Sequence, residues 1–72
     1  MRIGKPKPEP FAVRRDGSLV DRETGTKFGS VYNDLVRDRW TSVADNTNGE
    51  FHGSRRVDSA RRAWYAWQEN LT

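Results

Sequence analysis

The sequence predicts an α+β domain in which a three- to four-stranded antiparallel sheet packs against one C-terminal amphipathic helix. Two patterns predict this fold class. Apolar side chains recur at helical spacing over residues 54–72, whereas residues 11–52 hold short aromatic and β-branched runs separated by turn residues. Because a single helix covers only one face of a sheet, the sequence also predicts a second sheet face that is solvated or binds a partner.

The first ten residues predict a disordered N-terminal arm. All three prolines of the chain lie there, at alternating positions. Since proline fixes φ and removes a backbone donor, regular structure is disfavoured in this segment. We therefore expect an arm over residues 1–10 and one small domain over residues 11–72. The arm is interpreted either as a segment that lies along phosphates or as a solvated terminus.

Two runs after the arm predict a first hairpin. Residues 11–15 and 18–22 have the composition of strands, and Asp16 and Gly17 between them are typical of a two-residue hairpin turn. The sequence leaves open whether this hairpin joins the rest of the sheet.

The main strands are predicted over residues 27–33 and 39–44. Gly29 lies inside the first of these runs, which indicates a bulge or a close approach of another backbone. An Asn-Gly turn within residues 46–49 leads to a short partner strand at residues 50–52.

The predicted helix has a clear apolar stripe. At about 100° per residue, its apolar side chains fall within about 120° of one another. Ser54 occupies the expected N-cap position, just after Gly53. The two tryptophans of the helix are expected to pack against aromatic side chains of the sheet. The stripe consists of Val57, Ala60, Ala63, Trp64, Trp67 and Leu71.

Composition argues against several classes of function. The chain has no cysteine and one histidine, so no zinc site is expected, and no nucleotide-binding glycine motif or nucleophile motif occurs. No apolar run approaches the roughly 18–20 residues of a membrane span. We therefore expect a cytoplasmic protein that is not an enzyme and uses no cofactor, with no membrane partner.

The basic residues suggest a nucleic-acid contact. Ten of the thirteen are arginine, and the net charge is +3. Arginine suits contacts to phosphate and guanine. A GC-rich genome explains the arginine content as well, and nearby acidic residues make a merely solvated surface an alternative. The candidate contacts are Arg22, Lys27, Arg37, Arg39, Arg55 and Arg62.

A family resemblance points the same way. The pattern W-x-x-x-A at residues 40–44, then F-x-G-S-R-R at 51–56 and A-x-x-A-W at 60–64, resembles the sheet-plus-helix modules of the AP2-like group. This group includes the arm-site-binding domains of phage tyrosine integrases. The chain is also similar to short uncharacterised proteins of actinobacteria and their phages. The resemblance implies that the sheet enters the DNA major groove, with the helix supporting it from behind.

Two functions are therefore expected from the sequence. The first is a small DNA-binding or accessory protein of phage or mobile-element type that contacts duplex DNA through an arginine-bearing sheet face. The alternative is a phage-type interaction module that binds and modulates a host protein through the open sheet face or an edge strand. The chain is expected to be a monomer or a homodimer.

Overall fold

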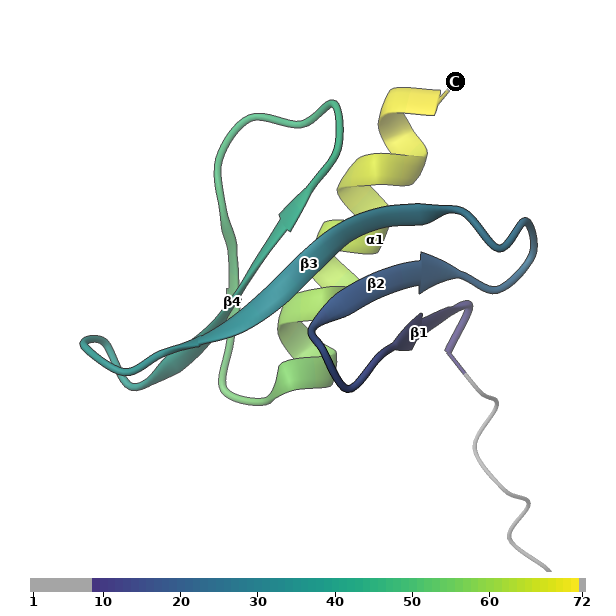
Figure 1. Cartoon of the computed structure of the whole chain (residues 1–72). Coiled ribbons are helices and arrows are strands. Elements are labelled where there is room, and N and C mark those ends of the chain that lie inside the picture. The colour runs from purple at the N-terminus through teal and green to yellow at the C-terminus, as the bar shows by residue number, and fades with distance from the viewer. Residues whose placement is uncertain (1–8, 72) are drawn as a thin grey trace, which may run out of the picture.

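The computed structural model describes residues 9–71 and places one helix across one face of a five-stranded antiparallel sheet (Figure 1). The strands follow one another in the order β1-β2-β3-β4-β5. The predicted α+β class is confirmed, but the strand count is higher than expected because the first hairpin continues the main sheet. The elements are β1 (Phe11–Val13), β2 (Ser18–Asp21), β3 (Lys27–Asp34), β4 (Arg39–Ala44), β5 (Phe51–Gly53) and α1 (Arg56–Leu71).

The pairing of β2 with β3 joins the first hairpin to the rest of the sheet, and it contains a bulge in β3. Leu19 of β2 pairs with Gly29, whereas the next residue, Val20, pairs with Lys27. Phe28 is therefore an extra residue between the two pairs, and both Phe28 and Gly29 are buried. Gly29 also meets β4 closely, since a Cβ there would overlap the carbonyl oxygen of Val43. Both properties predicted for Gly29 are thus confirmed.

The core lies between the sheet and α1. The ring of Phe28 stacks on the indole of Trp67 with 5.0 Å between the ring centroids. Phe11 packs against Phe28 in a T-shaped arrangement, with 6.4 Å between the two centroids. The aromatic packing expected between helix and sheet is therefore present. The buried apolar residues are Phe11, Leu19, Phe28, Val31, Ala44, Ala60, Ala63 and Trp67.

A buried pair of hydroxyls also ties α1 to the sheet. Ser59 donates to the carbonyl oxygen of Phe51 at 2.8 Å, and its Oγ lies 2.6 Å from Oγ of Ser42. Because Ser59 has only one hydroxyl proton, Ser42 is the donor in the second bond. Sequence periodicity missed Ser59, since a polar residue at this position does not belong to an apolar stripe.

The ends of α1 differ from the prediction. The carbonyl of Arg55 accepts the backbone bond from Ser59, so Arg55 rather than Ser54 occupies the N-cap position. At the other end, Leu71 is 56% exposed because the helix extends past the sheet there. In the described part of the chain, no helix has the length and apolar character needed to cross a membrane.

The first hairpin turn is longer than expected. A two-residue turn of the Asp-Gly kind requires a positive φ at both residues. Gly17 has a φ of +95°, but the φ of Asp16 is not positive. Instead, Gly17 N–H donates to the Arg14 carbonyl at 3.0 Å, and Arg14 N–H donates to Ser18 at 2.9 Å. These bonds enclose a three-residue loop that ends in a left-handed glycine, which matches the right-handed twist of the strands.

Residues 1–8 of the predicted arm lie outside the described residues, but Glu9 and Pro10 are bonded to the domain. The Glu9 carboxylate accepts two bonds from the Arg61 guanidinium, each 3.0 Å long. The Pro10 carbonyl accepts a bond from the backbone of Arg22 at 3.0 Å. The domain therefore includes the last two residues that the sequence assigned to the arm.

Asp21 is a buried carboxylate with a complete set of donors. It accepts bonds from Trp64 Nε1 at 3.1 Å, from Thr24 Oγ1 at 2.9 Å and from the Thr24 backbone at 3.1 Å. Burial raises the pKa of Asp21, but these hydrogen bonds outweigh that effect, and the pKa lies below its ordinary value. The charged form is therefore the one that stabilises the fold.

Replacement of Asp21 by asparagine is expected to lower the free energy of unfolding at pH 6 by about 1–3 kcal/mol, because hydrogen bonds to a charge are lost. A depressed pKa contributes stability above the unfolded pKa of about 3.9 and loses it as the pH falls through the folded value. The difference between wild type and Asp21→Asn should therefore shrink between about pH 5 and pH 2. Urea unfolding of the two proteins at pH 6 and at about pH 2 measures the difference in unfolding free energy. The same difference at both pH values would contradict this role of Asp21.

Candidate nucleic-acid interface

The face of the sheet opposite α1 is uncovered by any described segment, and we call it the open face. Ser42 points toward α1, as its bond to Ser59 shows, so its neighbours Thr41 and Val43 point the other way. Their cross-strand partners follow from the register. The open face consists of Ala12, Ser18, Val20, Lys27, Ser30, Tyr32, Asp34, Arg39, Thr41, Val43 and His52.

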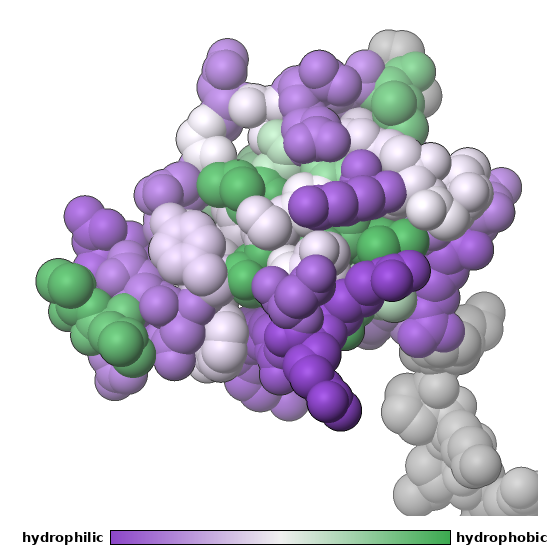
Figure 2. Space-filling view, in the orientation of Figure 1, coloured by the Kyte–Doolittle hydropathy of each residue, from purple (hydrophilic) through white to green (hydrophobic). Residues whose placement is uncertain are grey.

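The open face mixes polar and apolar side chains. In Figure 1 the strands β2 and β3 pass in front of α1, so Figure 2 views the molecule from this side. Small apolar areas there are separated by polar ones, and no large apolar patch spans the sheet. Such a surface fits a polar partner better than a second hydrophobic layer.

A row of hydrogen-bonded side chains crosses three strands of the open face. Tyr32, Thr41 and His52 are direct neighbours on β3, β4 and β5. Thr41 Oγ1 lies 3.1 Å from His52 Nδ1, and Arg39 Nη2 lies 3.4 Å from His52 Nε2. Because a guanidinium only donates, Nε2 is the acceptor in the contact with Arg39, and Nδ1 is left to donate to Thr41. The ring thus holds the Arg39 side chain against the sheet.

Tyr32 continues this row toward the loop before β5. Its hydroxyl donates to Glu50 Oε2 at 3.0 Å. This hydrogen bond, burial and the charges of Glu50 and Asp34 raise the pKa of Tyr32 above its ordinary value. The phenol therefore remains a neutral donor at physiological pH, and its half-exposed ring stands on the open face.

The structure brings only some of the six predicted cations to the open face. Lys27 and Arg39 lie on it. The Lys27 side chain is exposed, and its charge contributes to lowering the pKa of Asp16 in the β1–β2 turn. Arg37 lies beside the open face, in the turn between β3 and β4, where its Nη1 pairs with Asp34 at 3.2 Å.

The other three cations lie elsewhere. Arg22 follows β2, and its Nε donates to the Phe11 carbonyl at 3.2 Å, next to β1. Arg55 precedes α1 and pairs with Asp58 at 3.2 Å, whereas Arg62 is exposed on α1 itself. Since α1 covers the opposite face, the six residues do not form one surface. Sequence spacing could not separate them, because it carries no information on which sheet face a helix covers.

Sequence reasoning also missed the polar row. His52 appeared as an isolated strand residue, and Thr41 as an ordinary member of β4. Their proximity depends on the register of β4 against β5, and a shift of one residue would have placed His52 on the side of α1. The Asn-Gly turn that precedes β5 was the only available signal for this hairpin, and it does not define the register.

The β3–β4 hairpin extends beyond α1, and its turn carries two exposed apolar residues (Figure 1). Leu35 and Val36 are 82% and 95% exposed. Figure 2 shows apolar atoms at the end of this hairpin, apart from the rest of the surface.

Comparison of the chain with protein-family models, with curated proteins and with solved structures found no match. The function is therefore inferred from the surfaces of the domain: the open face with Lys27, Arg39 and the polar row, and the adjoining hairpin with Arg37.

Proposed function

We propose that the chain is a small DNA-binding or accessory protein, of phage or mobile-element type, that contacts duplex DNA through its open face. The observation that carries the proposal is an uncovered sheet face on which Lys27, Arg39 and Tyr32 project from adjacent strands. Adjacent strands lie about 4.8 Å apart, so the β3–β4 ribbon fits a major groove about 12 Å wide. The helix then supports the sheet from behind.

The side chains divide into two roles under this proposal. Lys27 and Arg37 lie toward opposite ends of β3, where they suit phosphates on either side of the groove. Arg39 is held against the sheet by His52, and Tyr32 carries a neutral hydroxyl, so these two suit contacts near base edges. The carboxylates of Asp34 and Glu50 already accept bonds from Arg37 and Tyr32, which lowers their repulsion of phosphate.

Replacement of Lys27 by glutamate is expected to weaken binding to a fluorescent 20-base-pair duplex about tenfold at 50 mM salt and to lower the log–log salt slope by about 1. Arg62→Glu is the matched control, since it makes the same charge change on α1, away from the open face. Fluorescence anisotropy measures both. Absence of binding up to about 100 μM protein, or equal losses in the two variants, would contradict the proposal.

Binding of a partner protein is the second candidate function, and the exposed Leu35 and Val36 at the β3–β4 turn favour it. Apolar side chains in such a position suit insertion into a pocket of another protein. The anisotropy experiment separates the two candidates, because a protein-binding module would show no salt-dependent affinity for the duplex.

A further inference from the structure

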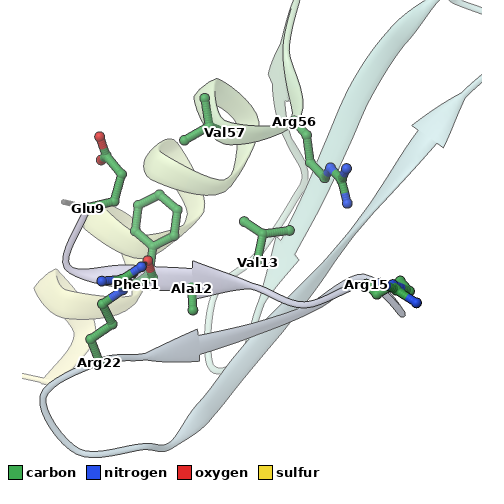
Figure 3. Close-up of a pocket in the computed structure, with 8 residues that line it drawn as sticks. All are labelled: Glu9, Phe11, Ala12, Val13, Arg15, Arg22, Arg56 and Val57. Carbon is green, nitrogen blue, oxygen red and sulfur yellow. Dashed lines mark hydrogen bonds between the residues drawn. The ribbon is translucent and has the colours of Figure 1, made fainter.

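A groove of about 630 Å³ runs along β1 on the edge of the sheet, next to the start of α1 (Figure 3). It adjoins the open face at Ala12, but none of the residues proposed to contact DNA line it. We infer that this groove binds an extended, acidic segment of a partner protein. The inference depends on three properties of the groove: its apolar wall, its free strand edge and its charge.

The apolar wall comes from both layers of the fold. Phe11 and Val13 of β1 face α1, and Val57 in the first turn of α1 lies across from them (Figure 3). Val13 and Val57 are only half-buried and pack at the margin of the core. Apolar side chains of an extended peptide, which alternate along its length, would cover this margin.

The free edge comes from the position of β1 as an outer strand. Pro10 and Arg14 point their peptide groups toward β2, as their bonds to Arg22 and Ser18 show. Along a strand of an antiparallel pair, residues whose N–H and C=O point toward the partner strand alternate with residues whose groups point away from it. The N–H and C=O groups of Phe11 and Val13 therefore point outward, away from β2. The Phe11 carbonyl already accepts a bond from Arg22 Nε. The N–H of Phe11 and the N–H and C=O of Val13 are the outward groups of β1 left to receive a further strand.

The charge of the groove selects an acidic occupant. Arg22 and Arg15 lie toward its two ends, and Arg56 reaches down from the start of α1 on the side of Val13 (Figure 3). Among the described residues that line it, the one carboxylate is that of Glu9, which accepts two bonds from Arg61. Three arginines therefore line the groove against one carboxylate that is already paired, although the Arg56 guanidinium also packs over the Trp40 ring at 5.3 Å and Arg22 Nε is bonded to the Phe11 carbonyl. Carboxylates near both ends of a bound segment would match this arrangement.

Other occupants fit the groove less well. The N-terminal segment of this chain, residues 1–8, carries Arg2, Lys5 and Lys7 and no acidic residue, so its charge has the wrong sign. If β1 of a second copy of the chain paired with β1, the arginines of the two copies would face one another. Because like charges placed opposite one another repel, such pairing is disfavoured. Duplex DNA has the right sign, but it offers neither apolar side chains nor backbone amides to pair with Val13.

The test is an NMR titration of the ¹⁵N-labelled protein, without DNA, with an end-capped heptapeptide of alternating aspartate and valine. We expect saturable shifts of the β1 amides with a Kd below about 100 μM, and none with the same peptide carrying lysine in place of aspartate. Arg15→Glu should weaken binding at least about tenfold, whereas the matched change Arg62→Glu should alter it less than about twofold.

Val13→Pro tests the strand edge itself. It removes an outward N–H and exchanges one apolar side chain for another, so the pairing of β1 with β2 and the amide spectrum of the sheet should persist while peptide binding is lost. Equal affinity for the aspartate and lysine peptides, shifts confined to the open face, or no shift at about 1 mM peptide would each overturn the inference. A dimer in light scattering that Val13→Pro abolishes would assign the groove to a second copy and overturn it too. None of these outcomes bears on DNA binding.

Discussion

Replacement of Gly29 by valine is expected to unfold the domain at room temperature. A Cβ at this position would overlap the Val43 carbonyl oxygen and lie 3.0 Å from Ala44 Cα, both in the backbone of the neighbouring strand. No side-chain rotation relieves such a clash, so β3 and β4 would have to separate. A chain of 72 residues has a total stability of about 4–11 kcal/mol, and loss of this pairing removes most of it.

Circular dichroism and urea unfolding measure the effect, and Gly49→Val is the matched control. Gly49 has a φ of +97° but no atom within 4 Å of an added Cβ, so only backbone strain of about 1–2 kcal/mol is expected there. If Gly29→Val kept a native spectrum and unfolded no earlier than Gly49→Val, the close approach of β3 and β4 would be wrong.

Truncation of Trp67 to alanine is expected to cost about 3–5 kcal/mol of unfolding free energy. Trp67 is 6% exposed, and its indole stacks on Phe28, which in turn touches Phe11. The alanine variant would leave a cavity at the centre of the contact between α1 and the sheet. In a domain of this size, the loss amounts to a large part of the total stability.

The control for Trp67→Ala is Tyr65→Ala on the same helix. Tyr65 is 58% exposed and contacts the edge of Trp64, so its truncation should cost about 1 kcal/mol or less. Thermal unfolding followed by circular dichroism compares the two variants directly. Equal midpoints would mean that the helix stripe is not the core that stabilises the sheet.

Local signals in the sequence predicted most of the fold. The helical spacing of apolar residues from Val57 to Leu71 and the strand-like run that contains Gly29 each specify an element without information from the rest of the chain. The errors arose where distant contacts decide the outcome. Ser59 is buried only because Ser42 and the Phe51 carbonyl meet it. Likewise, the pairing of β2 with β3, which continues across the bulge at Phe28, makes the sheet five-stranded.

The candidate site was harder to predict than the fold. Counting arginines identified cations but not their positions, so Arg55 and Arg62 of the helix layer were grouped with Lys27 of the sheet. Which residues share a face depends on strand register and on the side that α1 covers. Neither the register nor the covered side is encoded by neighbouring residues in the sequence. The contact of His52 with Thr41 could not be predicted for the same reason.

The most direct test of the proposal that the open face binds duplex DNA is a titration of the ¹⁵N-labelled protein with a 20-base-pair duplex at about 50 mM salt. We predict that amide shifts concentrate at Lys27, Tyr32 and Thr41 and in the β3–β4 turn, while amides on the exposed side of α1 stay unchanged. Shifts centred on Arg62 and the rest of α1, or no shifts at all, would contradict the account.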